Sequence, residues 1–395
     1  MTSSVLDVDA LIDDPQTRIV VCCGAGGVGK TTTAAALGLR AAESGRRVVV
    51  LTIDPARRLA QSLGLTTLDN TPKAVKDIDL ALGGSLDAMM LDMKRTFDDV
   101  VLAHAAPDKA EQILANPFYQ AVSSSFAGTQ EYMAMEKLGQ LRLEADRDPD
   151  NPRWDLIVVD TPPSRSALDF LDAPKRLGSF LDGRFIRLLA APARVGGRAY
   201  LKIFSAGVNI VTTTLTKVLG GQMLTDVQTF VAALDTMFGG FRERADHTYA
   251  LLKDGGTAFL VVATPERDAL REASYFVDRL DEEGMPLAGL VINRVYRVSA
   301  PGLSAARALS AAEQLGDDEG GGSPGDSSGS DTTAITQVLL RLHADQAEIA
   351  ARHQSLTRRF VAGHPGIPVV EVPAAAQDIH DLVGLRAVGD ALAGH

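Results

Sequence analysis

One short segment of the chain has the residue types and spacing of a phosphate-binding loop. It matches the pattern Gly-x-x-x-x-Gly-Lys-Ser/Thr through Gly24, Ala25, Gly26, Gly27, Val28, Gly29, Lys30 and Thr31. Glycines allow successive backbone N–H groups to turn towards phosphates, and a helix that starts there adds a favourable dipole. We predict that this loop binds Mg²⁺-ATP, with Lys30 at the β- and γ-phosphates, Thr31 on the Mg²⁺ ion and Thr32 at the α-phosphate.

Two aspartates at the ends of apolar runs are candidates for the same site. Asp160 ends the run LIVVD, where a carboxylate can hold the Mg²⁺ shell beside the phosphates. An aspartate there could also cap a turn, but the nearby loop favours the metal role. Asp54 follows another run and is the candidate to orient or deprotonate an attacking water, with a simple Asp-Pro turn as the alternative.

The elements that must position these residues are six short runs rich in Val, Ile and Leu. They occupy residues 18–23, 48–54, 155–160, 258–264, 287–293 and 367–373. Several alternate with helical stretches, and continuous apolar strands of this kind belong to a parallel sheet covered on both faces. The expected fold class is therefore α/β, a P-loop NTPase with a mainly parallel sheet flanked by helices, plus an inserted all-helical subdomain.

The spacing of the runs predicts the insertion. About 100 residues separate Asp54 from Asp160, whereas a βαβ unit needs only about 30. A second excess precedes the run at 258–264. We assign the ATPase domain to residues 1–85, 154–173 and 254–395, and a helical subdomain at one edge of the sheet to residues 86–153 and 174–253.

A stretch near the C-terminus differs in composition from the rest. Residues 316–331 are acidic, rich in Gly and Ser, and devoid of large apolar side chains. Such a stretch buries too little surface to offset its chain entropy. We expect a disordered loop at about 314–332, inside the ATPase domain because helical sequence and a strand follow it.

Composition excludes several classes of function. The chain has 395 residues and a net charge of -11, which repels nucleic acid and anionic lipid, so no nucleic-acid partner is expected. Cys22 and Cys23 are adjacent in a strand and cannot readily pair or supply a zinc site. The sequence shows neither a secretory signal nor about 20 consecutive apolar residues. We therefore expect a cytoplasmic protein.

Three segments in order resemble a known family. GAGGVGKTT, TIDPARRLAQSLG and VVDTPPSRSALDFL are similar to the phosphate loop, first switch and second switch of the arsenite-pump and tail-anchored-protein-targeting ATPases, within the deviant-Walker class. The likeness continues through ATPER, VINRV and VEVP. It implies ATP hydrolysis with Asp54 as the catalytic residue, and Asn293 and Pro373 beside the adenine. It also implies a dimer with nucleotide at its interface and a helical subdomain that handles a protein client or membrane-associated effector.

The sequence departs from this family in three places. Ala25 replaces a signature lysine that reaches the partner's phosphates, so hydrolysis is slow, or a paralogous subunit supplies the lysine, or the chain is a non-hydrolysing regulatory subunit. We prefer the heterodimer with a lysine-bearing paralogue. Residues 165–167, Arg-Ser-Ala, replace Gly-His-Thr of the second switch, so we expect the coupling between nucleotide and helical subdomain to differ from that of the family. The cysteines of metalloid-responsive and zinc-binding members are missing, and neither property is expected.

Two further questions stay open at this stage. A partition or division-site ATPase of the same class predicts a basic face or a basic C-terminal helix, and the nearly balanced ending at 378–395 disfavours the latter. Within the predicted helical subdomain, methionines and phenylalanines either line an adaptable client groove or pack in the core. These residues are Met89, Met90, Met93, Met133, Met135, Met223, Met237, Phe118, Phe126, Phe230 and Phe238.

Overall fold

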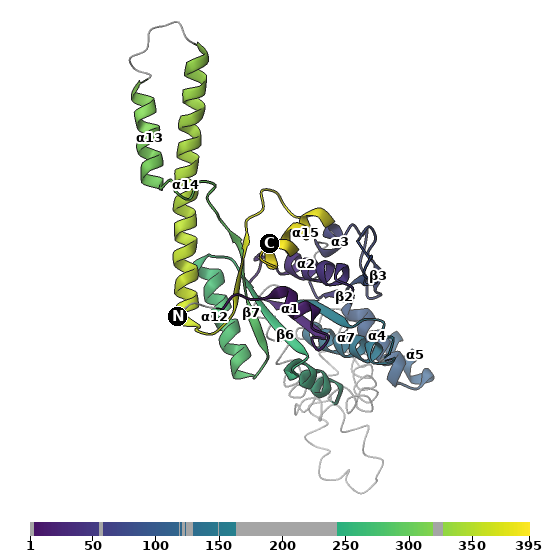
Figure 1. The fold of residues 1–395 in the computed structure, drawn as a ribbon. Helices are drawn as coiled ribbons and strands as arrows, with labels where there is room; N and C mark the ends of the chain where they lie inside the picture. The colour runs from purple at the N-terminus through teal and green to yellow at the C-terminus, as the bar shows by residue number, and fades with distance from the viewer. Residues whose placement is uncertain are drawn as a thin grey trace, which may run out of the picture.

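The computed structural model is built around one eight-stranded sheet (Figure 1). It describes residues 4–54, 58–117, 119–120, 123, 129–148, 150–162, 243–318 and 327–395. The strands lie in the order β3-β4-β2-β5-β1-β6-β7-β8, and all neighbours are parallel except β3 and β4. This arrangement confirms the predicted α/β class with a mainly parallel sheet.

All six predicted runs form strands, and the structure adds two more. The strands are β1 (Ile19–Cys23), β2 (Arg47–Thr52), β3 (Lys73–Ala74), β4 (Ser85–Met90), β5 (Leu156–Asp160), β6 (Thr257–Ala263), β7 (Leu287–Val295) and β8 (Val369–Pro373). The helices are α1 (Val8–Asp13), α2 (Lys30–Glu43), α3 (Arg58–Ser62), α4 (Met93–His104), α5 (Pro107–Ala115), α7 (Thr129–Ala145), α12 (Arg267–Glu282), α13 (Ala305–Asp318), α14 (Ser327–Gly363) and α15 (Leu382–Leu392).

Strand β4 corrects the expected start of the helical subdomain at residue 86. Residues 85–90 pair in parallel with β2, with Leu86 opposite Val48 and Met90 opposite Thr52. A six-residue run with one aspartate has too few turns to show whether its period is that of a helix or a strand. The ATPase sheet therefore continues to Met90, and the first helix after it is α4.

Helices cover both faces of the sheet. Alternate residues of each strand point to opposite faces, so Val49 and Val159 join one buried cluster, whereas Val48 and Val158 join the other. The first cluster takes side chains from α4, α5, α7 and α12, and the second from α1, α2, α3 and α15. The sheet is thus enclosed by two layers, which fix the positions of the strand ends.

The described part of the predicted helical subdomain covers a sheet face. In α4 and α7, Val100 and Leu138 share the core cluster of β1, β2 and β5. Met89, Met133 and Met135 are buried there, while Met90 and Met93 are partly buried against the core. Core packing accounts for these five methionines. Residues 163–242, most of the second insertion, lie outside the described residues, as do the other methionines and phenylalanines named above.

Helices α13 and α14 reach into both ends of the segment expected to be a loop. Helix α13 ends at Asp318 and α14 begins at Ser327, which leaves residues 319–326 outside the described part. Contact between the two helices offsets the low helix propensity of Gly and Ser, because tertiary packing supplies most helix stability. The pair projects away from the sheet (Figure 1). Among the helices that the structure describes, none is long and apolar enough to span a bilayer.

A buried arginine ties the N-terminal segment to the sheet. Arg46 donates to the Asp155 carboxylate from Nε at 2.7 Å, and its other nitrogens donate to the carbonyls of Ile12, Asp14 and Thr17. Because these acceptors are wholly or partly buried, losing their donor costs more than losing a surface ion pair.

We expect Arg46→Ala to lower the free energy of unfolding by about 3 kcal/mol, measured by urea denaturation, because it leaves a partly buried carboxylate without its cation. The matched control is Arg47→Ala, since Arg47 makes one exposed hydrogen bond, to Asn151. The control should change stability by less than about 0.5 kcal/mol. Equal losses in the two variants would contradict this account.

Candidate nucleotide-binding site

The predicted phosphate loop connects β1 to α2 and is held close to its neighbours. Gly24 has a φ of 147°, and a Cβ atom there would lie 2.1 Å from the Val262 carbonyl oxygen of β6. Gly29 has a φ of 98°, and a Cβ atom there would lie 2.2 Å from the Asn293 amide nitrogen. Only glycine fits either position, which gives a structural reason for the first and last glycines of the motif.

The loop leads directly into the start of α2. Gly29 occupies the N-cap position and provides no side-chain cap. The first N–H groups of α2 therefore receive no capping side chain, and the positive end of the helix dipole faces the loop. This is the arrangement that binds phosphate groups in proteins.

Lys30 lies folded over the loop. Its Nζ donates to the Ala25 carbonyl oxygen at 2.8 Å, and the residue is buried. Burial lowers the pKa of Lys30, and the negative charge of Asp160 opposes that effect. Two of the three ammonium donors remain for an anion, so the structure places a cation where the motif predicts the phosphates.

Asp160 joins three elements through one carboxylate oxygen. Its Oδ2 accepts a hydrogen bond from Thr31 Oγ1 at 2.8 Å and another from Thr52 Oγ1 at 2.8 Å. Oδ1 is buried and has no hydrogen-bond partner within the described ranges. Burial raises the pKa of Asp160 to about 6, although the hydrogen bonds from Thr31 and Thr52 and the charge of Lys30 counteract it.

The residues around Asp160 fit a magnesium ion. Mg²⁺ binds oxygen ligands and is usually held by one or two protein groups together with substrate phosphates. The Thr31 hydroxyl and the Asp160 carboxylate are such groups, and the unpartnered Oδ1 is a buried acceptor that a hydrated cation would satisfy. The predicted metal residues therefore lie together.

Asp54 reaches the same edge of the sheet. It follows β2, is half-buried, and its backbone N–H donates to Thr52 Oγ1 at 3.3 Å. Burial contributes most to the raised pKa of Asp160, and the negative charge of Asp54 adds to it. The candidate catalytic carboxylate of Asp54 is thus near enough to the candidate metal carboxylate of Asp160 for their charges to interact.

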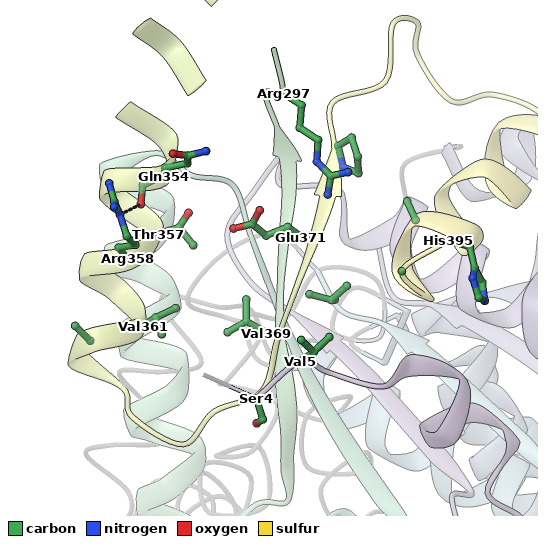
Figure 2. Close-up of a pocket in the computed structure, with 15 residues that line it drawn as sticks. Ser4, Val5, Arg297, Gln354, Thr357, Arg358, Val361, Val369, Glu371 and His395 are labelled. Atoms are coloured by element: carbon green, nitrogen blue, oxygen red, sulfur yellow. Dashed lines mark hydrogen bonds between the residues drawn. The ribbon is translucent and has the colours of Figure 1, made fainter. Parts of the chain in front are cut away.

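Of the two expected adenine residues, Asn293 makes a hydrogen bond to the loop. Its side-chain amide donates to the Val28 carbonyl oxygen at 2.8 Å, and its own oxygen accepts from the Arg294 N–H. Pro373 ends β8 and lines a separate groove of about 930 Å³, which no loop residue lines. This groove runs along β8, which carries Glu371, with α14 on one side of the strand and His395 on the other (Figure 2). Pro373 pairs with Val295 of β7, two residues beyond Asn293, so both residues lie near the same end of neighbouring strands, and their place beside the adenine stays a prediction.

Two threonines that sequence reasoning missed complete the site. Thr52 donates to Asp160, and Thr161 donates to the Cys22 carbonyl at 2.9 Å, so each joins neighbouring strands at the carboxyl edge. The available signal was their position, a hydroxyl residue at the end of an apolar run. Ala25 is 7% exposed and belongs to the buried cluster on the α2 side of the sheet, so it presents neither charge nor polar side chain to another subunit.

A glycine loop between a strand and a helix, with its lysine, its threonine and an aspartate at the end of an adjacent strand, defines a P-loop nucleoside triphosphatase. Residues 17–300 match the family model described as Anion-transporting ATPase, which covers more than half of the sequence. The chain belongs to this family of ATPases, as the resemblance of its switch segments implied.

Individual relatives are distant. ATPase GET3 of Ajellomyces dermatitidis is 26% identical over 290 residues, which covers 72% of this chain and 75% of that protein. ATPase ASNA1 homolog 2 of Paramecium tetraurelia is 24% identical over 290 residues, covering 72% and 78%. Protein Rv2184c of Mycobacterium tuberculosis is 31% identical over 186 residues, or 42% of this chain, and the match spans only 40% of that relative's length.

The raised pKa of Asp160 gives a pH-dependent prediction for stability. Because the folded pKa of about 6 exceeds the ordinary 3.8, the Asp160 contribution to stability is full below pH 3.8 and lost as pH rises through about 6. Asp160→Asn removes the buried charge and keeps an acceptor for both threonines. We expect it to raise the unfolding free energy of the nucleotide-free protein by up to about 3 kcal/mol at pH 8, at about 1.4 kcal/mol per pKa unit.

The gain in unfolding free energy of Asp160→Asn should disappear near pH 4. Chemical denaturation of the variant and the unaltered chain at pH 8 and at pH 4 measures it. The control is Asp13→Asn at an exposed position on α1, which should show no such pH-dependent gain. A loss of stability in Asp160→Asn that is the same at both pH values would contradict the account.

Proposed function

We propose that this chain binds Mg²⁺-ATP at the phosphate loop and hydrolyses it to ADP and phosphate in the cytoplasm. The observation that carries the proposal is the Asp160 carboxylate, which is buried, hydrogen-bonded to Thr31 and left with one unpartnered oxygen in the described part. Membership of an ATPase family supports the activity. Two reduced, buried cysteines support a reducing compartment.

Each residue of the site has a defined task in this proposal. The loop N–H groups and Lys30 bind the phosphates and offset their negative charge. Thr31 and Asp160 would hold Mg²⁺, which supplies Lewis-acid neutralisation of the phosphate oxygens when bound. Asp54 orients the attacking water and accepts its proton, so that oxygen bonds to phosphorus as the bond to the leaving ADP breaks. Asn293 braces the loop at Val28.

We further propose that the chain works in a dimer that ATP closes and hydrolysis reopens. Nucleotide would lie at the interface, and the helical subdomain would respond by handling a protein client or membrane-associated effector. The support is the resemblance of the two switch segments to ATPases that use this cycle. Asp54 and Asp160, the acids of those two segments, lie at the same edge of the sheet, so one bound phosphate could influence both.

Ala25 favours a second candidate function. An alanine with a buried side chain cannot donate the positive charge that the family's signature lysine supplies to a neighbouring active site. In this alternative the chain binds ATP without turnover and regulates a lysine-bearing paralogue in a heterodimer. A third arrangement combines intrinsic hydrolysis with the heterodimer: the paralogue supplies the lysine and activates hydrolysis by this chain.

Steady-state release of phosphate from Mg²⁺-ATP by the purified chain tests the proposal. We expect measurable turnover that falls at least about 100-fold in Asp54→Asn, because that variant loses the general base while keeping the shape of the residue. The matched control, Asp278→Asn on an exposed position of α12, should retain full turnover.

The outcomes separate the two functions. Turnover that depends on Asp54 in the isolated chain supports intrinsic hydrolysis. Tight ATP binding without turnover supports the regulatory subunit, and addition of a lysine-bearing paralogue then tests the heterodimer. Failure to bind ATP in the presence of Mg²⁺ would contradict both.

A further inference from the structure

Helices α13 and α14 form a two-helix hairpin that projects beyond the sheet (Figure 1). The sheet end of α14 is anchored, because Phe360 is buried in the core cluster and Leu356 packs against it. Further along α14, the helix has α13 as its neighbour. The projecting part is therefore an arm with exposed side chains on its outer surface.

The contact between the two helices is made largely by small side chains. Ala308 and Ala312 of α13 and Ala344 of α14 are buried. Two side chains of α14 fasten the pair: Gln337 donates to the Ala312 carbonyl at 2.9 Å, and His343 bonds the Leu303 carbonyl at 2.8 Å. The fully buried positions of this contact are thus alanines, and most of the large apolar residues of α14 lie on another side of the helix.

Those large residues form an exposed line along α14. We call the line the apolar stripe, and it consists of Ile335, Val338, Leu339, Leu342 and Ile349, each between 39% and 62% exposed. Steps of three, four and seven residues keep side chains on one face of a helix. Ala344 is two residues from Leu342, about 160° around the helix, so the stripe faces away from α13. The stripe lies on the same face of α14 as the buried Phe360, because the 18 residues from Leu342 to Phe360 make about five full turns.

The stripe is spaced so that it complements itself. Ile335 and Ile349 each lie seven residues from Leu342, on opposite sides. An antiparallel two-fold pairing centred on Leu342 therefore places each isoleucine against the other in the second copy, and Leu342 against itself. The two-fold axis places the same flank of both α14 helices on one side of the contact. Arg341 of one copy therefore lies within one helical turn of Asp345 of the other.

The charges on the flank agree with this pairing. Arg341 and Asp345 are exposed, and neither makes an ion pair in the residues that the structure describes. In the two-fold arrangement they form two reciprocal pairs at the border of an apolar contact. Two hairpins packed in this way bring the two α14 helices against each other, with each α13 on the outer side of its own α14.

We propose that the apolar stripe of α14 binds the same stripe of a second copy of this chain, in an antiparallel two-fold contact centred on Leu342. The contact is separate from the phosphate loop and does not require nucleotide. It would hold two subunits together through their arms during the stages in which the nucleotide sites are open.

Sedimentation of the nucleotide-free full chain over a concentration series tests the contact, because a dimer closed by ATP does not then contribute. We expect a dimer whose dissociation constant rises at least about 100-fold in Leu342→Asp, which places two unpaired carboxylates in an apolar contact. The matched control is Leu309→Asp, an exposed leucine on α13 outside the stripe, which should leave the dimer intact.

A second measurement keeps the proposal testable if Leu342→Asp folds poorly. Both natural cysteines are buried, so the unaltered chain should form no disulfide-linked dimer. Mild oxidation should link Leu342→Cys into a dimer but leave Glu348→Cys, which lies on another face of α14, unlinked. A monomeric nucleotide-free protein, a Leu342→Asp dimer as strong as the unaltered one, or equal linking of the two cysteine variants would overturn the proposal.

Discussion

The buried carboxylate of Asp160 is the constraint on which the rest of the site depends. One oxygen binds the hydroxyls of Thr31 and Thr52, so the start of α2, the end of β2 and the end of β5 meet at a single charge. A charge removed from water costs free energy unless its surroundings compensate, and here the second oxygen lacks a partner in the described residues. The protein groups alone therefore leave an unfavourable feature that a bound cation would relieve.

The sheet supplies the rigidity that this arrangement requires. Strand β5 lies between β1 and β2, and both faces of the sheet are covered, so its last residue is held beside the loop by pairing on both sides. Thr161 continues the link to the Cys22 carbonyl, just before the loop begins. The same covered sheet anchors α14 through Phe360. The phosphate site and the projecting arm are thus both attached to the same sheet, although no described contact joins them directly.

Sequence patterns predicted the parts of the protein whose chemistry is local. The loop, Lys30 and Asp160 follow from residue types at fixed spacing, and six strands follow from continuous apolar runs. Thr52 could not be found in this way, since its role depends on β2 and β5 being neighbours, and strand order is a property of the fold. Strand β4 was missed because its residues fit a helix equally well. The hairpin needed coordinates for a further reason: alanines close it and isoleucines stay exposed, whereas periodicity alone assigns the larger residues to the contact.

The most direct test of the account is the dependence of ATP affinity on Mg²⁺, measured by calorimetry in Mg²⁺ and in EDTA. The unaltered chain should bind ATP at least about tenfold more tightly with Mg²⁺, a difference of about 1.4 kcal/mol. Thr31→Val should lose most of that difference, because it keeps the volume of the side chain and removes the hydroxyl beside Asp160. Equal affinity in Mg²⁺ and EDTA, or a Thr31→Val variant that responds to Mg²⁺ like the unaltered chain, would contradict the assignment of this carboxylate to a metal site.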